Sequence, residues 1–236
     1  MRLRTRVVLQ LAALFLALGA SALAQNAYLY VVHALPGRDL ADNLNPQLPV
    51  DILIDGKSCL THSLTFGNTT SPYTLAAGTY EVQISLANTL APCTNPAVLD
   101  SQVTLTAGES ITAVAAISST QPVLQLFTEN LVSVVPGNAR FVFVNSADAP
   151  ALEATLIQVG VKNPLTFTGS ANPGAQTYIP VPAGEYLIQI TEVGSTNVLT
   201  SQTMSLADQS IVFSYASGET LNKTVQLVNR TVRDVF

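Results

Sequence analysis

The sequence is poor in charge, tryptophan, histidine and cysteine. Of its 236 residues only 11% are charged, none is tryptophan, and histidine and cysteine occur twice each. No basic run follows residue 6, so nucleic-acid binding has no electrostatic support. No stretch after residue 24 is apolar for long enough to predict a transmembrane helix.

The motifs of common hydrolases are also missing. The chain has no G-x-S-x-G elbow and no H-E-x-x-H run. A glycosidase needs two carboxylates facing each other across a cleft, and no such pair can be picked out from the spacing. We therefore predict that the protein is not an enzyme and that it uses no cofactor.

The first 24 residues have the composition of a secretory signal peptide. Three arginines precede an apolar run from Val7 to Leu18, and Ala22-Leu23-Ala24 fits the small-x-small cleavage pattern. Removal of 1–24 leaves seven basic and fifteen acidic residues, a net charge near −8. We expect an exported protein of the periplasm, cell envelope or extracellular space, and the signal does not distinguish among these.

A glycine turn that leads into a strand occurs twice, at 76–84 and at 182–190. In the first copy Tyr80, Val82 and Ile84 share one face and polar residues take the other, which is typical of a half-buried strand. Many short runs separated by turn signals favour antiparallel sandwiches. The predicted fold is all-β, with two tandem immunoglobulin-like antiparallel β-sandwich domains. They are placed at 25–130 and 139–236, with a linker at 131–138.

The first half shows the expected order of strands and loops most clearly. No helical period appears between strands, so crossover helices and a parallel sheet are not expected. Asp55-Gly56 is a strong hairpin-turn signal, because both central residues of such a turn need positive φ. The expected strands lie at 27–33, 50–54, 60–66, 80–86, 99–106, 110–117 and 123–127. The expected loops lie at 34–49, 67–72 and 88–97.

Three short motifs of the first half resemble a secreted bacterial family known as domain of unknown function 4397. They are Tyr30 to Ala34, Val50 to Gly56 and Ala77 to Tyr80, and Ala183 to Tyr186 carries the pattern into a second copy. The second copy departs from it at 157–160, where the Asp–Gly hairpin is replaced. The resemblance implies an immunoglobulin-like fold and an envelope location, and it implies no established activity.

Two structural features follow from single residues. Cys59 and Cys93 are the only cysteines, and an exported protein meets oxidising conditions, so we predict a disulfide between them. A redox role is the alternative, although no CxxC spacing exists. Tyr80 and Tyr186 occupy the positions of a tyrosine corner, in which the hydroxyl closes a loop onto the backbone.

The histidines and several aspartates of the first half are candidate metal ligands. His33 and His62 could hold zinc or copper if they met a carboxylate such as Asp51 or Asp55, and the alternative is that both histidines are ordinary hydrogen-bonding or surface residues. Asp39 and Asp42 could join Asp51 and Asp55 as calcium ligands, although no D-x-[DN]-x-[DN]-G run exists. We therefore assign no metal site.

Carbohydrate binding usually relies on exposed aromatic rings, and Tyr73 and Tyr178 are the candidates; packing at a domain rim is the alternative.

The interpretation we favour is an exported, non-catalytic interaction module of the cell envelope or extracellular space. It would bind an envelope protein or a polysaccharide through loops and sheet edges. The alternative is a periplasmic protein that binds a metal or a small ligand. The sequence does not predict an oligomeric state.

Overall fold

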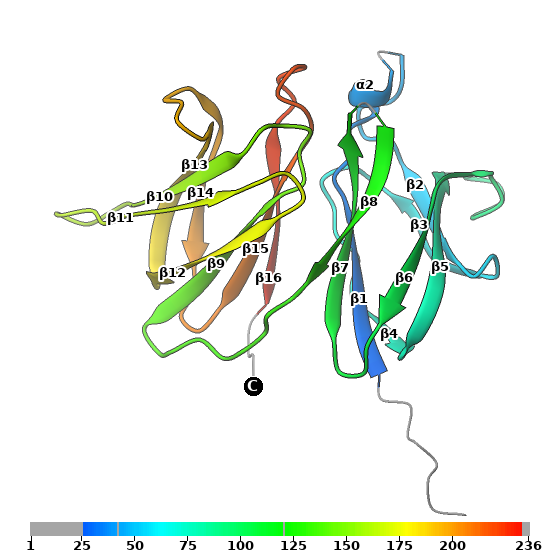
Figure 1. Cartoon of the computed structure of the whole chain (residues 1–236), viewed down its shortest axis with the longest axis horizontal. Coiled ribbons are helices and arrows are strands. Elements are labelled where there is room, and N and C mark those ends of the chain that lie inside the picture. The colour runs from blue at the N-terminus through cyan, green and yellow to red at the C-terminus, as the bar shows by residue number, and fades with distance from the viewer. Residues whose placement is uncertain (1–25, 42, 120, 233–236) are drawn as a thin grey trace, which may run out of the picture.

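The computed structural model describes residues 26–41, 43–119 and 121–232, and it consists almost entirely of strands in two sandwiches (Figure 1). The predicted signal peptide at 1–24 lies outside these residues. Within them, no helix has the length and apolar character needed to cross a membrane. The chain therefore divides into two successive sets of strands, which we call the first and the second sandwich.

The first sandwich contains two sheets of four strands each, in the orders β4-β1-β7-β8 and β3-β2-β5-β6. Its elements are β1 (Asn26–His33), α2 (Gly37–Leu40), β2 (Val50–Ile54), β3 (Ser58–Leu64), β4 (Tyr73–Ala76), β5 (Gly78–Leu86), β6 (Ala97–Leu105), β7 (Ser110–Ser118) and β8 (Gln121–Thr128).

The second sandwich repeats this topology, with the orders β12-β9-β15-β16 and β11-β10-β13-β14. Its elements are β9 (Asn138–Asn145), β10 (Leu152–Gln158), β11 (Thr166–Ala171), β12 (Gln176–Pro182), β13 (Gly184–Glu192), β14 (Val198–Leu206), β15 (Ile211–Ser217) and β16 (Gln226–Val232). The predicted pair of tandem sandwiches is confirmed.

The structure corrects several local expectations. The 34–49 segment, expected as an irregular loop, contains the short helix α2, and β4 is a strand that the sequence pattern did not reveal. Each sandwich also contains one parallel pair, β1 with β7 and β9 with β15, without a crossover helix. The expected turn at Asp55-Gly56 is confirmed, with φ of 52° and 61°.

The central strands β1, β7, β9 and β15 carry apolar residues on both faces. One face packs in the core of its own sandwich and the other packs towards the neighbouring sandwich. In β9, Phe141 and Phe143 point into the core of their own sandwich, whereas Val142 and Val144 point towards the first sandwich. The same alternation occurs in β1, β7 and β15. The outward faces of these strands, together with residues of β8, β16 and the connecting segments, make one cluster, which we call the interface core. Its buried members are Val32, Ala34, Val114, Ala116, Phe127, Val134, Val142, Val144, Ile211, Phe213, Tyr215 and Val228.

Polar contacts close the edge of the interface core. Arg230 of β16 pairs with the buried carboxylate of Glu129, which also accepts a hydrogen bond from Ser110 Oγ at 2.7 Å. The Arg230 guanidinium lies 3.8 Å from the centre of the Tyr30 ring. Burial raises the pKa of Tyr215 to about 12, so its hydroxyl stays neutral, and it lies 3.1 Å from the Thr112 hydroxyl. The two sandwiches thus share an apolar interface and a buried ion pair.

Candidate functional site

Asp51 joins three segments of the first sandwich. It lies in β2, and its side chain is fully buried. The carboxylate accepts hydrogen bonds from the backbone N–H groups of Ser63, Asn88 and Cys93 at 2.9, 3.2 and 2.8 Å. His62 Nδ1 lies 2.7 Å from the same carboxylate. Burial raises the pKa of Asp51, but the N–H donors outweigh burial and hold the pKa below its usual value.

The predicted disulfide between Cys59 and Cys93 is confirmed. It attaches the 88–93 loop to β3, beside the point where Asp51 accepts the N–H of Cys93. Two independent connections therefore hold this loop over β2.

Of the four candidate metal ligands, the structure brings together only His62 and Asp51. His33 is buried, and its Nε2 lies 2.7 Å from the carbonyl oxygen of Leu48. Its burial lowers the pKa of the imidazole, and the bond to Leu48 opposes this weakly. Asp55 accepts the N–H of Glu81 at a different end of the sheet. Among the described residues, no group of three or more His, Cys, Asp or Glu side chains could hold a metal ion. Asp42 lies outside these residues.

Asp51 itself is poorly suited to a metal. A carboxylate offers about four lone-pair directions, and here three N–H groups and one imidazole nitrogen already use them. The contact between Asp51 and His62 therefore serves the packing of β3 and the 88–93 loop.

The tyrosines at the glycine turns close onto the backbone. Tyr80 donates its hydroxyl to the carbonyl of Ala76 at 2.8 Å, and Tyr186 donates to that of Pro182 at 2.9 Å. The Tyr186 side chain is fully buried, whereas Tyr80 is half-buried.

The two aromatic candidates for sugar binding both lie in strands. Tyr73 is in β4 and donates to the carbonyl of Leu60 at 3.3 Å. Tyr178 is in β12 with 40% of its surface exposed, and its hydroxyl lies 2.9 Å from Gln176 Nε2. Of the two, only Tyr178 presents much of its ring to solvent.

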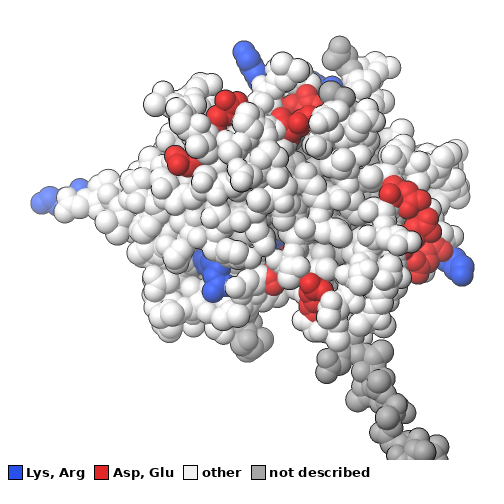
Figure 2. Space-filling view, in the orientation of Figure 1, with Lys and Arg blue, Asp and Glu red and all other residues white. Residues whose placement is uncertain are grey.

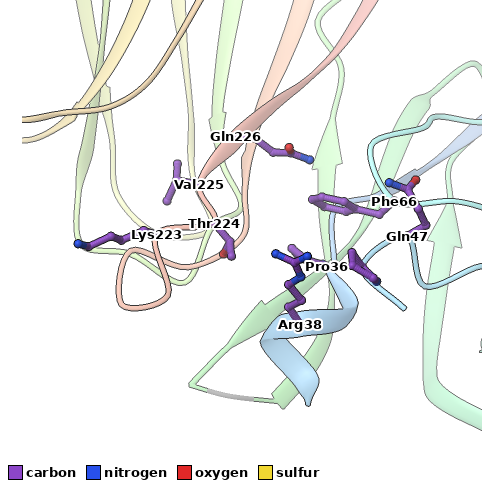
Figure 3. A pocket seen from close by; sticks show the side chains of 9 residues that line it. Pro36, Arg38, Gln47, Phe66, Lys223, Thr224, Val225 and Gln226 are labelled. Atoms are coloured by element: carbon purple, nitrogen blue, oxygen red, sulfur yellow. The ribbon is translucent and has the colours of Figure 1, made fainter. Parts of the chain in front are cut away.

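A cleft opens between the two sandwiches where α2 faces the loop before β16 (Figure 3). We call it the junction cleft, and its volume is about 460 Å³. Its lining from the first sandwich is Pro36, Arg38, Pro46, Gln47 and Phe66, and from the second Lys223, Thr224, Val225 and Gln226. The volume lies within the range of roughly 300–1,000 Å³ that is typical of small-ligand sites.

Backbone contacts hold the first wall of the junction cleft in shape. Phe66 donates its N–H to the carbonyl of Gln47 at 2.8 Å, and Gly37 donates to that of Pro46 at 3.3 Å. The Phe66 ring also contacts His33 edge-on, with 6.2 Å between the ring centres. The segment that carries Arg38 and Gln47 is thus tied to the strands beneath it.

The second wall is the tight 218–224 turn. Gly218 has a φ of 85°, and a Cβ at this position would lie 2.5 Å from the Thr224 carbonyl oxygen, so only glycine fits. The Thr224 hydroxyl lies 2.8 Å from a carboxylate oxygen of Asp39 and accepts the N–H of Glu219 at 2.9 Å. Thr224 therefore links the two walls.

Acidic groups gather beside the junction cleft but do not line it. Burial raises the pKa of Asp39, and the hydrogen bonds from Thr224 and Asn222 oppose this increase. Burial also raises the pKa of Glu219, and the nearby charges of Asp39 and Asp148 add to the shift. Asp148 and Glu219 face a separate hollow. The charged groups of the cleft lining itself are Arg38 and Lys223.

Four lining residues, Pro36, Arg38, Pro46 and Gln47, lie in the 34–49 segment, one of the loops through which we expected binding; none of the lining residues was predicted individually. Phe66 was expected at the end of a strand, whereas it follows β3 and turns towards Gln226 of the other sandwich (Figure 3). The available signal was Arg38, the one basic residue in the 34–49 loop of a chain in which charge is scarce. In the orientation of Figure 1, the space-filling view shows few charged residues on the face of the molecule towards the viewer (Figure 2).

The chain matches a known protein family. The model of the domain of unknown function DUF4397 matches residues 27–155, which cover the first sandwich and the beginning of the second. A search of curated proteins finds no significant match.

Several solved structures resemble the chain, all at low identity. The TIE protein of Bacillus anthracis is 13% identical with a TM-score of 0.24; 83% of this chain is covered, but only 32% of that one. The chain thus spans about a third of that protein. A candidate cell adhesion protein of Bacteroides fragilis is 13% identical, with a TM-score of 0.28 and coverage of 90% and 99%. A candidate adhesin of Bacteroides ovatus is 10% identical, with a TM-score of 0.27 and coverage of 89% and 94%. Scores at this level carry no inference about function.

Proposed function

The chain belongs to the DUF4397 family of domains of unknown function, and we propose that it is an exported, non-catalytic interaction module. It binds a component of the cell envelope or of the extracellular medium through loops that meet between its two sandwiches. The observation that carries this proposal is the junction cleft, whose lining comes from both sandwiches.

The interface core supports this proposal because it makes the two walls of the cleft one body. A pair of domains on a flexible linker would lose orientational freedom on closing around a ligand, and that loss weakens binding. Here Val142 and Val144 belong to the same buried cluster as Val114 and Val32 of the first sandwich. The junction cleft is therefore formed before any ligand arrives.

The side chains of the cleft are suited to recognition. Arg38 supplies positive charge within the cleft and Lys223 supplies it at the border, and the amides of Gln47 and Gln226 each provide donors and an acceptor. Phe66 supplies a flat apolar surface. We propose that the cleft binds its ligand without a chemical step.

Export agrees with the Cys59–Cys93 disulfide, because such bonds persist in oxidising compartments. The predicted signal at 1–24 indicates the same route.

Retention of the purified mature protein on envelope fractions tests the proposal. Envelopes of the source organism are mixed with the tagged protein, washed and pelleted. We expect saturable retention, and we expect the double variant Arg38→Gln/Gln226→Ala to be retained less. Lys57→Gln, which changes an exposed side chain in the β2–β3 turn, serves as the control. Absence of saturable retention on envelopes and on concentrated culture medium would exclude the proposed function.

A further inference from the structure

The junction cleft also indicates the class of its ligand, and this inference rests on the proposed function. Arg38 and Lys223 are two of only six lysines and arginines among the described residues, at positions 38, 57, 140, 162, 223 and 230. Both are exposed. Among those residues neither takes part in an ion pair, whereas Arg230 pairs with Glu129. Two unpaired cations therefore flank one cleft in an acidic protein.

Arg38 is placed to bind a carboxylate. Its side chain rises from α2 and its guanidinium lies across the cleft from Thr224 (Figure 3). A guanidinium binds a carboxylate through two parallel N–H···O bonds, which gives both strength and orientation. The neighbouring carboxylate of Asp39 is already bonded to Thr224, so it does not occupy the guanidinium.

The remaining lining fits a sugar ring. The Phe66 ring is half-buried and faces the amide of Gln226 (Figure 3). Its edge contact with His33 fixes its orientation. Sugar rings place C–H groups on their faces, which stack on an aromatic ring, and hydroxyls on their edges. Gln226 and Gln47 can donate to and accept from such hydroxyls.

Lys223 lies at the border between the junction cleft and a second pocket. Its side chain extends away from the cleft, on the far side of its loop from Arg38 (Figure 3). A polymer with a carboxylate on each unit can offer one carboxylate to Arg38 and another to Lys223.

We propose that the junction cleft binds an acidic polysaccharide, a polymer of sugars that carry carboxylates. Arg38 pairs with one carboxylate, Phe66 stacks under the ring of that unit, and the two glutamines bind its hydroxyls. Lys223 contacts a carboxylate further along the polymer.

Isothermal calorimetry on the mature protein tests this proposal with defined probes. The probes are oligomers of galacturonate, of mannuronate and guluronate, and of glucuronate with N-acetylglucosamine. Fully methyl-esterified galacturonate oligomers test the carboxylate, and a glutamate oligomer of equal charge tests an acidic peptide. We expect at least one of the uronate oligomers to bind, with affinity that falls as salt is added. The ester and the peptide should bind at least tenfold more weakly.

Single substitutions assign the roles. Arg38→Gln should weaken uronate binding about tenfold, because it removes a charged hydrogen-bonded pair. Lys223→Gln should weaken it about threefold, since its contact is exposed. Phe66→Leu should weaken binding while keeping apolar volume, with a thermal scan to confirm folding. Lys162→Gln removes the same charge from the β10–β11 hairpin and should leave binding unchanged.

The outcomes separate this inference from the proposed function. If no uronate oligomer binds, if the peptide binds as tightly, or if Arg38→Gln changes nothing, the acidic-polysaccharide assignment is wrong. Retention on envelopes that persists in such a case, and resists competition by uronates, would leave the interaction module intact with a different ligand. Uronate binding without envelope retention would support the cleft assignment and contradict the envelope role.

Discussion

At the scale of single residues, Asp51 shows that a buried carboxylate can be structural. Four hydrogen-bond partners converge on it from β3 and the 88–93 loop. The alternation in β2 assigns Asp51 to the face opposite Val50 and Ile52. It does not reveal that a distant loop folds back to cover that face.

Substitution of Asp51 should destabilise the protein. We expect Asp51→Asn to lower the free energy of unfolding at pH 7 by about 2–3 kcal/mol, because the amide cannot accept all the N–H donors. Urea unfolding followed by circular dichroism measures this. Asp55→Asn is the matched control, since Asn-Gly suits the same turn. Equal stability of the two variants would contradict the structural role of Asp51.

The pH dependence of Asp51 has a definite sign. Its pKa in the folded protein lies below the usual value, so its ionised form stabilises the fold at all pH values above that usual value. The contribution falls as the pH drops from about 4 towards the lower folded pKa. We expect Asp51→Asn to flatten this part of an acid-unfolding curve relative to Asp55→Asn. Parallel curves for the two variants would be inconsistent with this assignment.

The hydroxyls that close the glycine turns should also contribute to stability. We expect Tyr186→Phe to lower the free energy of unfolding by about 1 kcal/mol, since the part-buried hydrogen bond to the Pro182 carbonyl is lost. Tyr28→Phe is the control, because Tyr28 is 43% exposed. Denaturant midpoints compare them, and a Tyr28→Phe effect as large as that of Tyr186→Phe would argue against the bond.

At the scale of elements, the 88–93 loop depends on the disulfide. Cys59 and Cys93 are 34 residues apart, and closing a loop of this length contributes about 3–4 kcal/mol in the chain-entropy model. We expect Cys59→Ala/Cys93→Ala to lose about this much while keeping its β spectrum, as measured by urea unfolding. An unchanged midpoint would show that the contacts of Asp51 alone hold the loop.

The positions of the strands were easier to predict from the sequence than the pairing between strands. The alternation of apolar and polar residues, together with turn residues, predicted β2, β5 and β7. This is possible because the apolar positions within a strand indicate which of its faces is buried. Parallel pairing of β1 with β7 depends on segments about eighty residues apart, so no local pattern contains it. The short strand β4 was missed because its four residues pair only with β1.

At the scale of the whole molecule, the apolar character of β9 and β15 on both faces was a visible signal. The second half was expected only to repeat the first, and the second apolar face of these strands in fact packs against the other sandwich. The junction cleft could not be predicted, since it arises where α2 and the 218–224 turn meet across that interface. Its residues are distant in sequence and share no motif.

The buried pair at the edge of the interface core should behave as a unit. Arg230→Met leaves the Glu129 carboxylate buried and unpaired, and we expect a loss of about 3–5 kcal/mol. Arg230→Met/Glu129→Gln removes both charges and should recover most of that loss. Chemical unfolding measures both variants, and failure of the second substitution to restore stability would show that the charge pair is not the cause.

Calorimetric unfolding of the mature chain tests most directly whether the two sandwiches form one cooperative folding unit. We expect one transition whose calorimetric and van't Hoff enthalpies agree, because the interface core makes the sandwiches unfold together. In the same experiment, Arg230→Met should lower the temperature of that single transition. Two separate transitions, with only one shifted by the substitution, would contradict a shared core and a preformed cleft between the sandwiches.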